Sequence, residues 1–256
     1  MEIGVQTFTI RKYQKKNLYK AIEKLIDLGF LNFELARIKF NKTNALIIKK
    51  LVDKYGIKIS SIQAKPKDVF NHQQKLIEFC EIVGCKNIVI SMLPFKCIFG
   101  NDKDFYEFIS TLDSYYDEYT KNNIVLAYHH HNWEYTKLNN GKLMMDELLK
   151  KTSKIKIVHD TYWTYKSGRS SFEQIKKFKD RLLGIHLRDI TFYKKGLKVL
   201  SKDTEIGNGI IDFKKLIAKT TNVEYMVIEQ KTKTPYESLK KSYDYIKENV
   251  YIYGER

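Results

Sequence analysis

The feature that most constrains the fold is a regular alternation of short apolar runs with segments of helical periodicity. Eight such runs in 256 residues give about 32 residues per repeat, the size of one strand, one helix and two loops. We therefore predict an α/β fold, a single (β/α)8 TIM barrel formed as one domain by residues 1–256. The expected strands are 3–7, 30–35, 57–63, 87–91, 124–129, 154–159, 181–186 and 224–229.

Helices are expected between these strands because apolar residues recur there at spacings of three and four, as in 18–26, 46–55 and 76–83. Gly29, Gly56 and Gly84 each follow such a segment, where a left-handed helix cap is favoured. The longest stretch without a regular pattern is 189–209. We expect it to be an irregular functional loop that covers the site.

Composition excludes several classes of protein. The net charge is +16, but 40 of the 46 basic residues are lysines scattered along the chain, which favours a solvated surface over a nucleic-acid partner. Cys80, Cys85 and Cys97 form neither a disulfide framework nor a zinc-thiolate motif. No run approaches the ~20 apolar residues of a membrane span, and a first strand at residue 3 leaves no room for a signal peptide. These features predict a cytoplasmic protein.

Polar ionisable residues end three of the expected strands. Asp160, His186 and Glu229 each stand at the last position of an apolar run. Active sites of TIM barrels open at the carboxyl ends of the strands, and these side chains are metal ligands by type. The pattern therefore predicts a metalloenzyme.

A run of three histidines, His129 to His131, follows the fifth expected strand. Alternate residues of an extended segment point in opposite directions, so His129 and His131 share one face. Their imidazoles suit metal coordination, hydrogen bonding to a substrate oxygen, or proton transfer.

Five motifs in order along the chain give a more specific indication. With their spacing they resemble the sugar phosphate isomerase/epimerase family of xylose isomerase-like TIM barrels, to which inosose dehydratases and apurinic-site endonucleases are related. The resemblance covers nearly the whole chain. The motifs are 129–134 (HHHNWE), 160–163 (DTYW), 186–189 (HLRD), 205–213 (EIGNGIIDF) and 229–230 (EQ).

The resemblance implies one divalent ion, of Mn, Mg, Co, Fe or Zn, with Asp160, His186 and Glu229 as ligands. The fourth ligand would come from the strand-five segment, where Glu134 is the only acidic residue and His129 or His131 are the alternatives. Glu134 and Glu229 are expected to transfer the proton, with His131 supporting turnover. The expected substrate contacts are His129, Glu34, Trp163, Arg188 and Asp189.

The expected reaction is isomerisation or epimerisation of a keto or aldo sugar, or of its phosphate, through a metal-stabilised enediolate. An inosose-type dehydratase is the alternative, because it uses the same metal and intermediate. An apurinic-site endonuclease would need further histidines after strands three and four, where Gln63 and Ser91 stand. A non-catalytic sugar-binding barrel would not need a full ligand set. The expected partner is a small sugar, and a homo-oligomer is compatible with the sequence.

Overall fold

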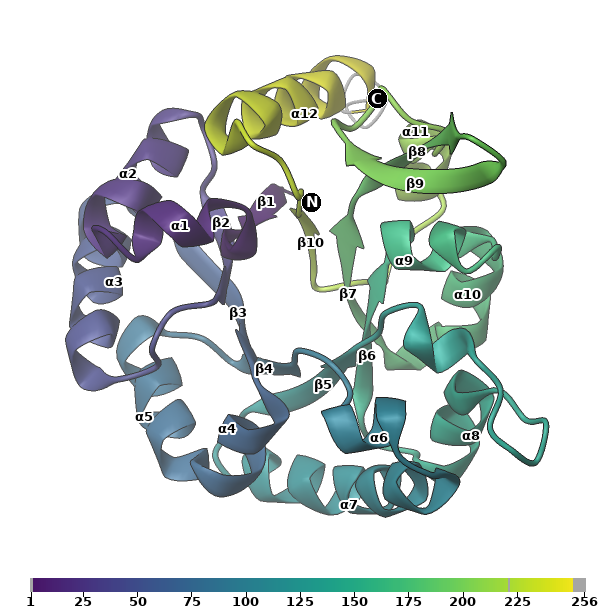
Figure 1. Ribbon diagram of the computed structural model, residues 1–256. Coiled ribbons are helices and arrows are strands. Elements are labelled where there is room, and N and C mark those ends of the chain that lie inside the picture. Colours follow the sequence, from purple (N-terminus) through teal and green to yellow (C-terminus); the bar gives the residue numbers. More distant parts are fainter. Residues whose placement is uncertain (1, 221, 251–256) are drawn as a thin grey trace.

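Eight parallel strands close into a barrel in the computed structural model, which describes residues 2–220 and 222–250 (Figure 1). Around the barrel the order is β1-β10-β7-β6-β5-β4-β3-β2, so β1 pairs with both β2 and β10 and the barrel has no free edge. The predicted fold is confirmed. The barrel strands are β1 Ile3–Gln6, β2 Asn32–Ala36, β3 Lys58–Ala64, β4 Asn87–Ile90, β5 Val125–His129, β6 Lys156–Asp160, β7 Leu182–Leu187 and β10 Tyr225–Ile228.

Helices form the outer ring and pack their apolar sides on the strands (Figure 1). Gly29, Gly56 and Gly84 have φ angles of 100°, 67° and 72°, the left-handed conformation predicted after helices. The α-helices are α1 Arg11–Gln14, α2 Leu18–Asp27, α3 Lys42–Tyr55, α4 Pro66–Asn71, α5 Gln73–Val83, α6 Phe95–Phe99, α7 Asp102–Thr120, α8 Met144–Lys151, α9 Thr161–Lys166, α10 Ser171–Phe178, α11 Phe213–Ala218 and α12 Pro235–Asn249. The 3-10 helices are η1 Thr7–Ile10, η2 Trp133–Tyr135 and η3 Lys179–Arg181.

The predicted strand bounds agree with the observed ones to within two residues. The expectation of an irregular segment over 189–209 is wrong, because most of it is an antiparallel hairpin of β8 Asp189–Lys195 and β9 Lys198–Thr204. Gly196, with a φ of 61°, lies in its two-residue turn. Most side chains of the hairpin are exposed or half-buried, so the sequence there has no apolar run that marks a strand.

Side chains alternate along each strand, so every second residue points into the barrel and the last such residue lies at its mouth. One apolar cluster joins barrel strands β4 to β7 and β10, through Val89, Ala127, Val158, Leu183, Tyr225 and Val227. Two residues beyond Ala127, Val158 and Val227, on the same strand face, stand His129, Asp160 and Glu229. The alternation that fills the barrel therefore also directs these three side chains inward above that cluster.

Cys80, Cys85 and Cys97 are buried and free. Among residues 2–220 and 222–250, no helix combines the length and the apolarity that crossing a membrane requires.

Candidate metal centre

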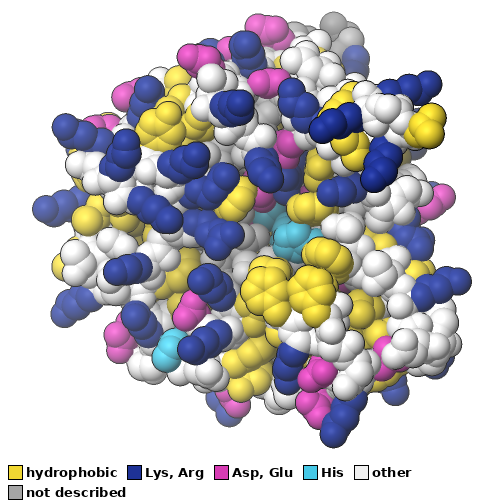
Figure 2. Space-filling model, viewed as in Figure 1, with side chains coloured by type: hydrophobic (Ala, Val, Ile, Leu, Met, Phe, Trp, Pro, Cys, Tyr) yellow, Lys and Arg dark blue, Asp and Glu magenta, His cyan; other side chains and the backbone are white. Residues whose placement is uncertain are grey.

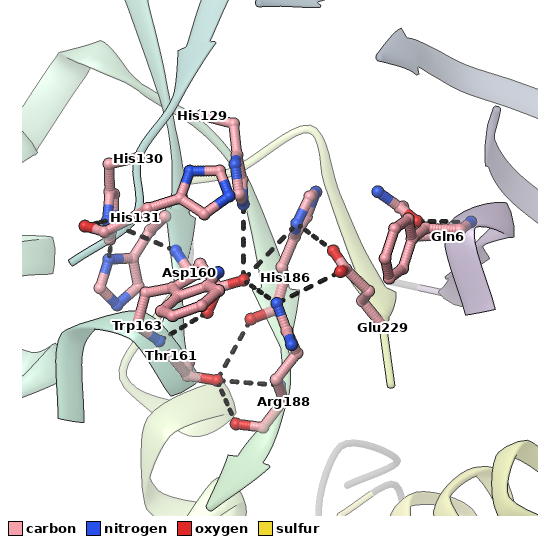
Figure 3. A network of polar contacts seen from close by, with 12 residues as sticks. Gln6, His129, His130, His131, Asp160, Thr161, Trp163, His186, Arg188 and Glu229 are labelled. Carbon is pink, nitrogen blue, oxygen red and sulfur yellow. Dashed lines mark hydrogen bonds and ion pairs between the residues drawn. The ribbon is translucent and has the colours of Figure 1, made fainter. Parts of the chain in front are cut away.

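Four buried side chains converge at the carboxyl end of the barrel: His129 from β5, Asp160 from β6, His186 from β7 and Glu229 directly after β10 (Figure 3). Each offers one ligand atom, and these atoms all lie within 4.8 Å of one another. Two imidazoles and two carboxylates form a mixed nitrogen and oxygen donor set that suits Mn, Fe, Co or Zn.

The contacts within this group leave a nitrogen for a cation. His186 Nδ1 lies 3.1 Å from Glu229 Oε2 and 3.9 Å from Asp160 Oδ2, and neither this nitrogen nor Nε2 of the same ring makes a hydrogen bond of good geometry. His129 Nε2 lies 3.4 Å from Asp160 Oδ2. A buried imidazole nitrogen between two carboxylates is unfavourable unless a proton or a metal ion joins them. The four residues therefore fit a divalent ion.

Asp160 is held in place by its own backbone and side chain. Its Oδ1 accepts a hydrogen bond of 2.9 Å from the backbone N–H of Trp163 and so caps α9. Its backbone N–H donates to His130 Nε2 at 3.1 Å. Oδ2 is the oxygen that contacts His129 and Arg188. The helix cap thus fixes which carboxylate oxygen faces the group.

Arg188 supplies a permanent positive charge to these carboxylates. Its Nη1 lies 3.2 Å from Asp160 Oδ2 and 3.2 Å from Glu229 Oε1, and its Nη2 bonds Asp203 of β9. Glu34 contacts Nε2 of His186 instead, so four carboxylates share this region with Arg188 and His186. Such an imbalance is costly in a buried site, and a divalent cation would offset it.

The pKa values follow from these contacts. Burial alone would lower the pKa of His186, but Glu34 and Glu229 raise it to about 10. Burial would raise the pKa of Glu229, whereas Arg188 and His186 lower it to about 2. Burial likewise opposes ionisation of Asp160, but Arg188 and the neighbouring imidazoles hold its pKa well below the ordinary value. Both carboxylates are ionised at neutral pH.

Two residues of the group, His129 and Glu229, line a cavity of about 1590 Å³. His129, His131, Trp163, Arg188 and Glu229 line this cavity, as predicted for residues at the mouth of the barrel. Residues of β9, including Asp203, also line it, so the hairpin stands at the mouth (Figure 1). The cavity exceeds the ~300–1,000 Å³ of common small-molecule pockets.

A comparison with protein families identifies this architecture. A family described as xylose isomerase-like TIM barrel matches residues 22–249. The chain belongs to this family. The resemblance inferred from the motifs is confirmed. A search of curated proteins gave no match.

Solved structures of several xylose isomerase-like barrels are similar to this one. A sugar phosphate isomerase/epimerase from Parabacteroides distasonis is 18% identical with a TM-score of 0.77, over 95% of this chain and 92% of that chain. The probable 3-DHS dehydratase AsbF of petrobactin synthesis, from Bacillus anthracis, is 13% identical with a TM-score of 0.74, over 96% and 99%. The IolI protein with a bound zinc atom is 14% identical with a TM-score of 0.70, over the full length of both chains. At these identities the likeness concerns the fold.

In this protein Glu134 is not part of the candidate metal group, which consists of His129, Asp160, His186 and Glu229. Its Oε2 accepts a hydrogen bond of 2.8 Å from the backbone N–H of His131, and its Oε1 accepts one from the Tyr128 hydroxyl. Burial raises the pKa of this carboxyl despite both bonds. The structure thus places His129, the alternative from the same segment, where sequence reasoning placed Glu134. The reason is that Glu134 lies in the turn η2, which directs it to Tyr128.

Glu34 also lies elsewhere than expected. Sequence reasoning predicts a substrate contact, but Glu34 is fully buried behind His186, with its Oε1 2.7 Å from His186 Nε2. Its Oε2 accepts hydrogen bonds from Ser61 at 2.6 Å and Tyr225 at 2.8 Å. A carboxylate in this position orients an imidazole so that the other nitrogen faces a metal. Tyr225 fits only because Gly184 has no side chain, since a Cβ there would lie 2.5 Å from its ring.

Asp189, another predicted substrate contact, organises the chain after the hairpin. Its carboxylate accepts hydrogen bonds from the backbone N–H groups of Gly207 at 3.0 Å, Gly209 at 2.9 Å and Ile211 at 3.2 Å. A Cβ at Gly209 would lie 2.1 Å from Asp189 Oδ1, so this approach requires glycine. Asp189 therefore binds backbone in the structure and does not line the cavity.

The histidine run divides as strand alternation predicts. His129 and His131 face the cavity. Burial, and to a smaller extent the neighbouring His129, lowers the pKa of His131 to about 3, so its imidazole is neutral. His130 points away and contacts His159 at 3.1 Å, a residue that sequence reasoning did not single out. Tyr225, Ser61 and Asp203 were missed too. The sequence signal for Tyr225 and Ser61 is their position on the inward-facing side of predicted strands. Asp203 has no such signal, because it belongs to no motif.

Proposed function

We propose that this protein is a divalent-metal-dependent sugar isomerase or epimerase whose metal ligands are His129, Asp160, His186 and Glu229. The observation that carries the proposal is the convergence of these four ligand atoms within 4.8 Å at the mouth of the barrel. A structural neighbour with zinc and others named as isomerases or epimerases support it. The proposal replaces Glu134 of the sequence-based ligand set with His129.

A divalent ion in this group would supply Lewis-acid stabilisation of negative charge on a substrate oxygen. The protein's own residues prepare the site. Glu34 fixes the ring of His186, the cap of α9 fixes Asp160, and Arg188 keeps Asp160 and Glu229 ionised. Trp163 lies beside His131, with 5.1 Å between their ring centres, and would provide an apolar wall for a sugar.

Proton transfer is assigned to Glu229 and His131, which both line the cavity. Their pKa values of about 2 and about 3 make each a weak base. They can take a proton from carbon only where negative charge on the adjoining oxygen is stabilised, as beside the carbonyl of a keto sugar. Glu134 is assigned a positioning role, because it bonds the backbone of His131.

The test is metal-dependent hydrogen exchange in full-length protein. Keto sugars are incubated in deuterium oxide with and without Mn²⁺ or Zn²⁺, and the carbon-bound deuterium is measured by NMR and mass spectrometry. We expect exchange beside the carbonyl with metal. It should be lost in Asp160→Asn and kept in the control Asp180→Asn, which changes an exposed carboxylate in η3.

The products distinguish the reactions. An isomerase or epimerase returns a sugar of unchanged mass apart from deuterium, whereas a dehydratase, the class of the AsbF neighbour, releases water and forms an ultraviolet-absorbing product. Exchange that is unaffected by chelation and by Asp160→Asn would refute the metal-dependent mechanism. Exchange that ends in water loss would assign the dehydratase alternative.

A further inference from the structure

The wall of the cavity is more basic than the chain as a whole. Eleven lysines and arginines line it against four aspartates and glutamates, compared with 46 and 30 in the whole sequence. Figure 2 shows dark blue side chains gathered beside the central hollow, on the side away from the large yellow side chains. A uniform excess of lysine would not produce this concentration at one site.

The acidic residues of the wall do not balance this charge. Asp203 and Glu229 pair with Arg188, and Glu205 accepts a hydrogen bond from Ser238. The fourth carboxylate is that of Asp68, in the first turn of α4. Within residues 2–220 and 222–250, the ion pairs include neither Arg11 nor Arg37, although both line the cavity. Two guanidiniums therefore face the cavity without a carboxylate partner.

Phe8, in η1 directly after β1, holds these two arginines on one side of the cavity. The guanidinium carbon of Arg11 lies 4.0 Å from the centre of the Phe8 ring, and Arg11 Nη1 donates a hydrogen bond of 2.9 Å to the Phe8 carbonyl. The guanidinium carbon of Arg37 lies 5.5 Å from the same ring. Cation–π contacts of this kind hold planar guanidiniums at defined positions.

The backbone and the electrostatics of the pair support a binding role. Arg37 follows β2 with a φ of 61°, a left-handed conformation that costs free energy in a non-glycine residue and is enriched at functional sites. Burial, followed by repulsion from Arg37, lowers the pKa of Arg11, while Glu229 acts in the opposite sense. The arginines therefore repel each other next to the candidate metal centre, and a bound anion would relieve that repulsion.

The choice of arginine is informative in this chain, which has 40 lysines and six arginines. Arg181 binds the backbone carbonyls of Ile155, Leu149 and Thr152, and Arg188 bridges the carboxylates of the site. In both places the planar fork of donors is used, which lysine cannot supply. Arginine at positions 11 and 37 points to the same requirement.

We propose that Arg11 and Arg37 form a subsite for an anionic group of the substrate, a phosphate or carboxylate carried by the sugar. This inference rests on the proposed function for the carbonyl end of the substrate, which would lie at His129, Asp160, His186 and Glu229. The cavity of about 1590 Å³ has room for both ends. Paired guanidiniums bind phosphate and carboxylate oxygens through charge-assisted, bidentate hydrogen bonds.

The first experiment measures anion binding without metal. Inorganic phosphate and acetate are titrated into chelator-treated full-length protein by calorimetry, with chloride at equal ionic strength as the reference. We expect binding that weakens about tenfold or more in Arg11→Gln or Arg37→Gln, because each loses charge-assisted hydrogen bonds. Lys58→Gln, at the opposite end of the barrel, is the matched control and should bind as the unchanged protein does.

Circular dichroism checks that each variant folds, and Arg11→Lys with Arg37→Lys tests the fork separately from the charge. Partial recovery in the lysine variants supports bidentate binding. Phosphate and acetate binding no stronger than that of chloride, or binding unchanged in the double glutamine variant, would overturn the subsite. Because these titrations use metal-free protein, they test the subsite independently of the proposed metal-dependent reaction.

The second experiment compares a neutral ketose, its phosphate and a sugar acid in the exchange assay. We expect the double glutamine variant to raise KM for the anionic substrate at least tenfold with little change in kcat, and to leave neutral sugars unaffected. The preferred substrate tells phosphate from carboxylate. Exchange with neutral sugars alone would overturn the subsite and leave the proposed function standing. Tighter, arginine-dependent binding of abasic duplex DNA would instead assign the arginines to nucleic acid and overturn the sugar assignment.

Discussion

Glu34→Gln tests whether the buried carboxylate behind His186 serves the metal centre or the substrate. Glutamine keeps the shape of the side chain, but it removes the negative charge that lies 2.7 Å from His186 Nε2. Without that charge the ring is less basic and its orientation less fixed. Loss of such an outer partner commonly weakens metal binding about 10–100-fold, or ~1.4–2.7 kcal/mol. We expect Zn²⁺ and Mn²⁺ affinity to fall by this amount.

The assay is competition with a fluorescent chelator at fixed pH, with circular dichroism as the check on folding. Ser61→Ala is the control, because it removes one 2.6 Å hydrogen bond to the same carboxylate and leaves the charge in place. It should change metal affinity much less than Glu34→Gln does, since the charge remains and the Tyr225 hydroxyl still donates a hydrogen bond of 2.8 Å to the same oxygen. Unchanged metal affinity in Glu34→Gln together with weaker sugar binding would refute the positioning role and return Glu34 to the substrate.

Three further outcomes follow from the geometry. His129→Ala should weaken metal binding at least tenfold, whereas Glu134→Gln should change it less than threefold; the reverse order in chelator competition would restore Glu134 as a ligand. Metal-free protein should lose thermal stability as the pH rises from 7 through about 10. Protonated His186 stabilises the fold, and this contribution is complete below the pKa of ~6.5 that the residue has in the unfolded chain and is lost above its folded pKa of about 10. Glu34→Gln should flatten this profile in calorimetry. Asp189→Ala should lower the free energy of unfolding in urea by about 2–4 kcal/mol, since it leaves the buried N–H groups of Ile190 and Ile211 without this acceptor; a change below about 0.5 kcal/mol would show that water replaces it.

Much of the fold and part of the site follow from local sequence. Asp160, His186 and Glu229 could be predicted because strand ends in a barrel meet at one rim, and the alternation of side chains placed His129 on the inner face. The choice between His129 and Glu134 could not be made. It depends on the turn Trp133–Tyr135 and on the Tyr128 hydroxyl, which only the folded segment brings to Glu134.

Contacts between distant segments account for the other differences. Glu34 and Tyr225 are 191 residues apart and meet inside the barrel, so neither belongs to a local motif. Arg11 and Arg37 approach Phe8 from the segments that follow β1 and β2, two strands that pair in the barrel. The hairpin was missed because exposed strands rich in lysine have no apolar run.

The most direct test of the metal centre is anomalous diffraction from a crystal of the full-length protein grown with Mn²⁺. The geometry predicts one strong anomalous peak per chain, bonded to His129, Asp160, His186 and Glu229, with the carboxylate of Glu134 outside its coordination sphere. A peak coordinated by Glu134 in place of His129, or no peak at the mouth of the barrel at saturating Mn²⁺, would contradict the account.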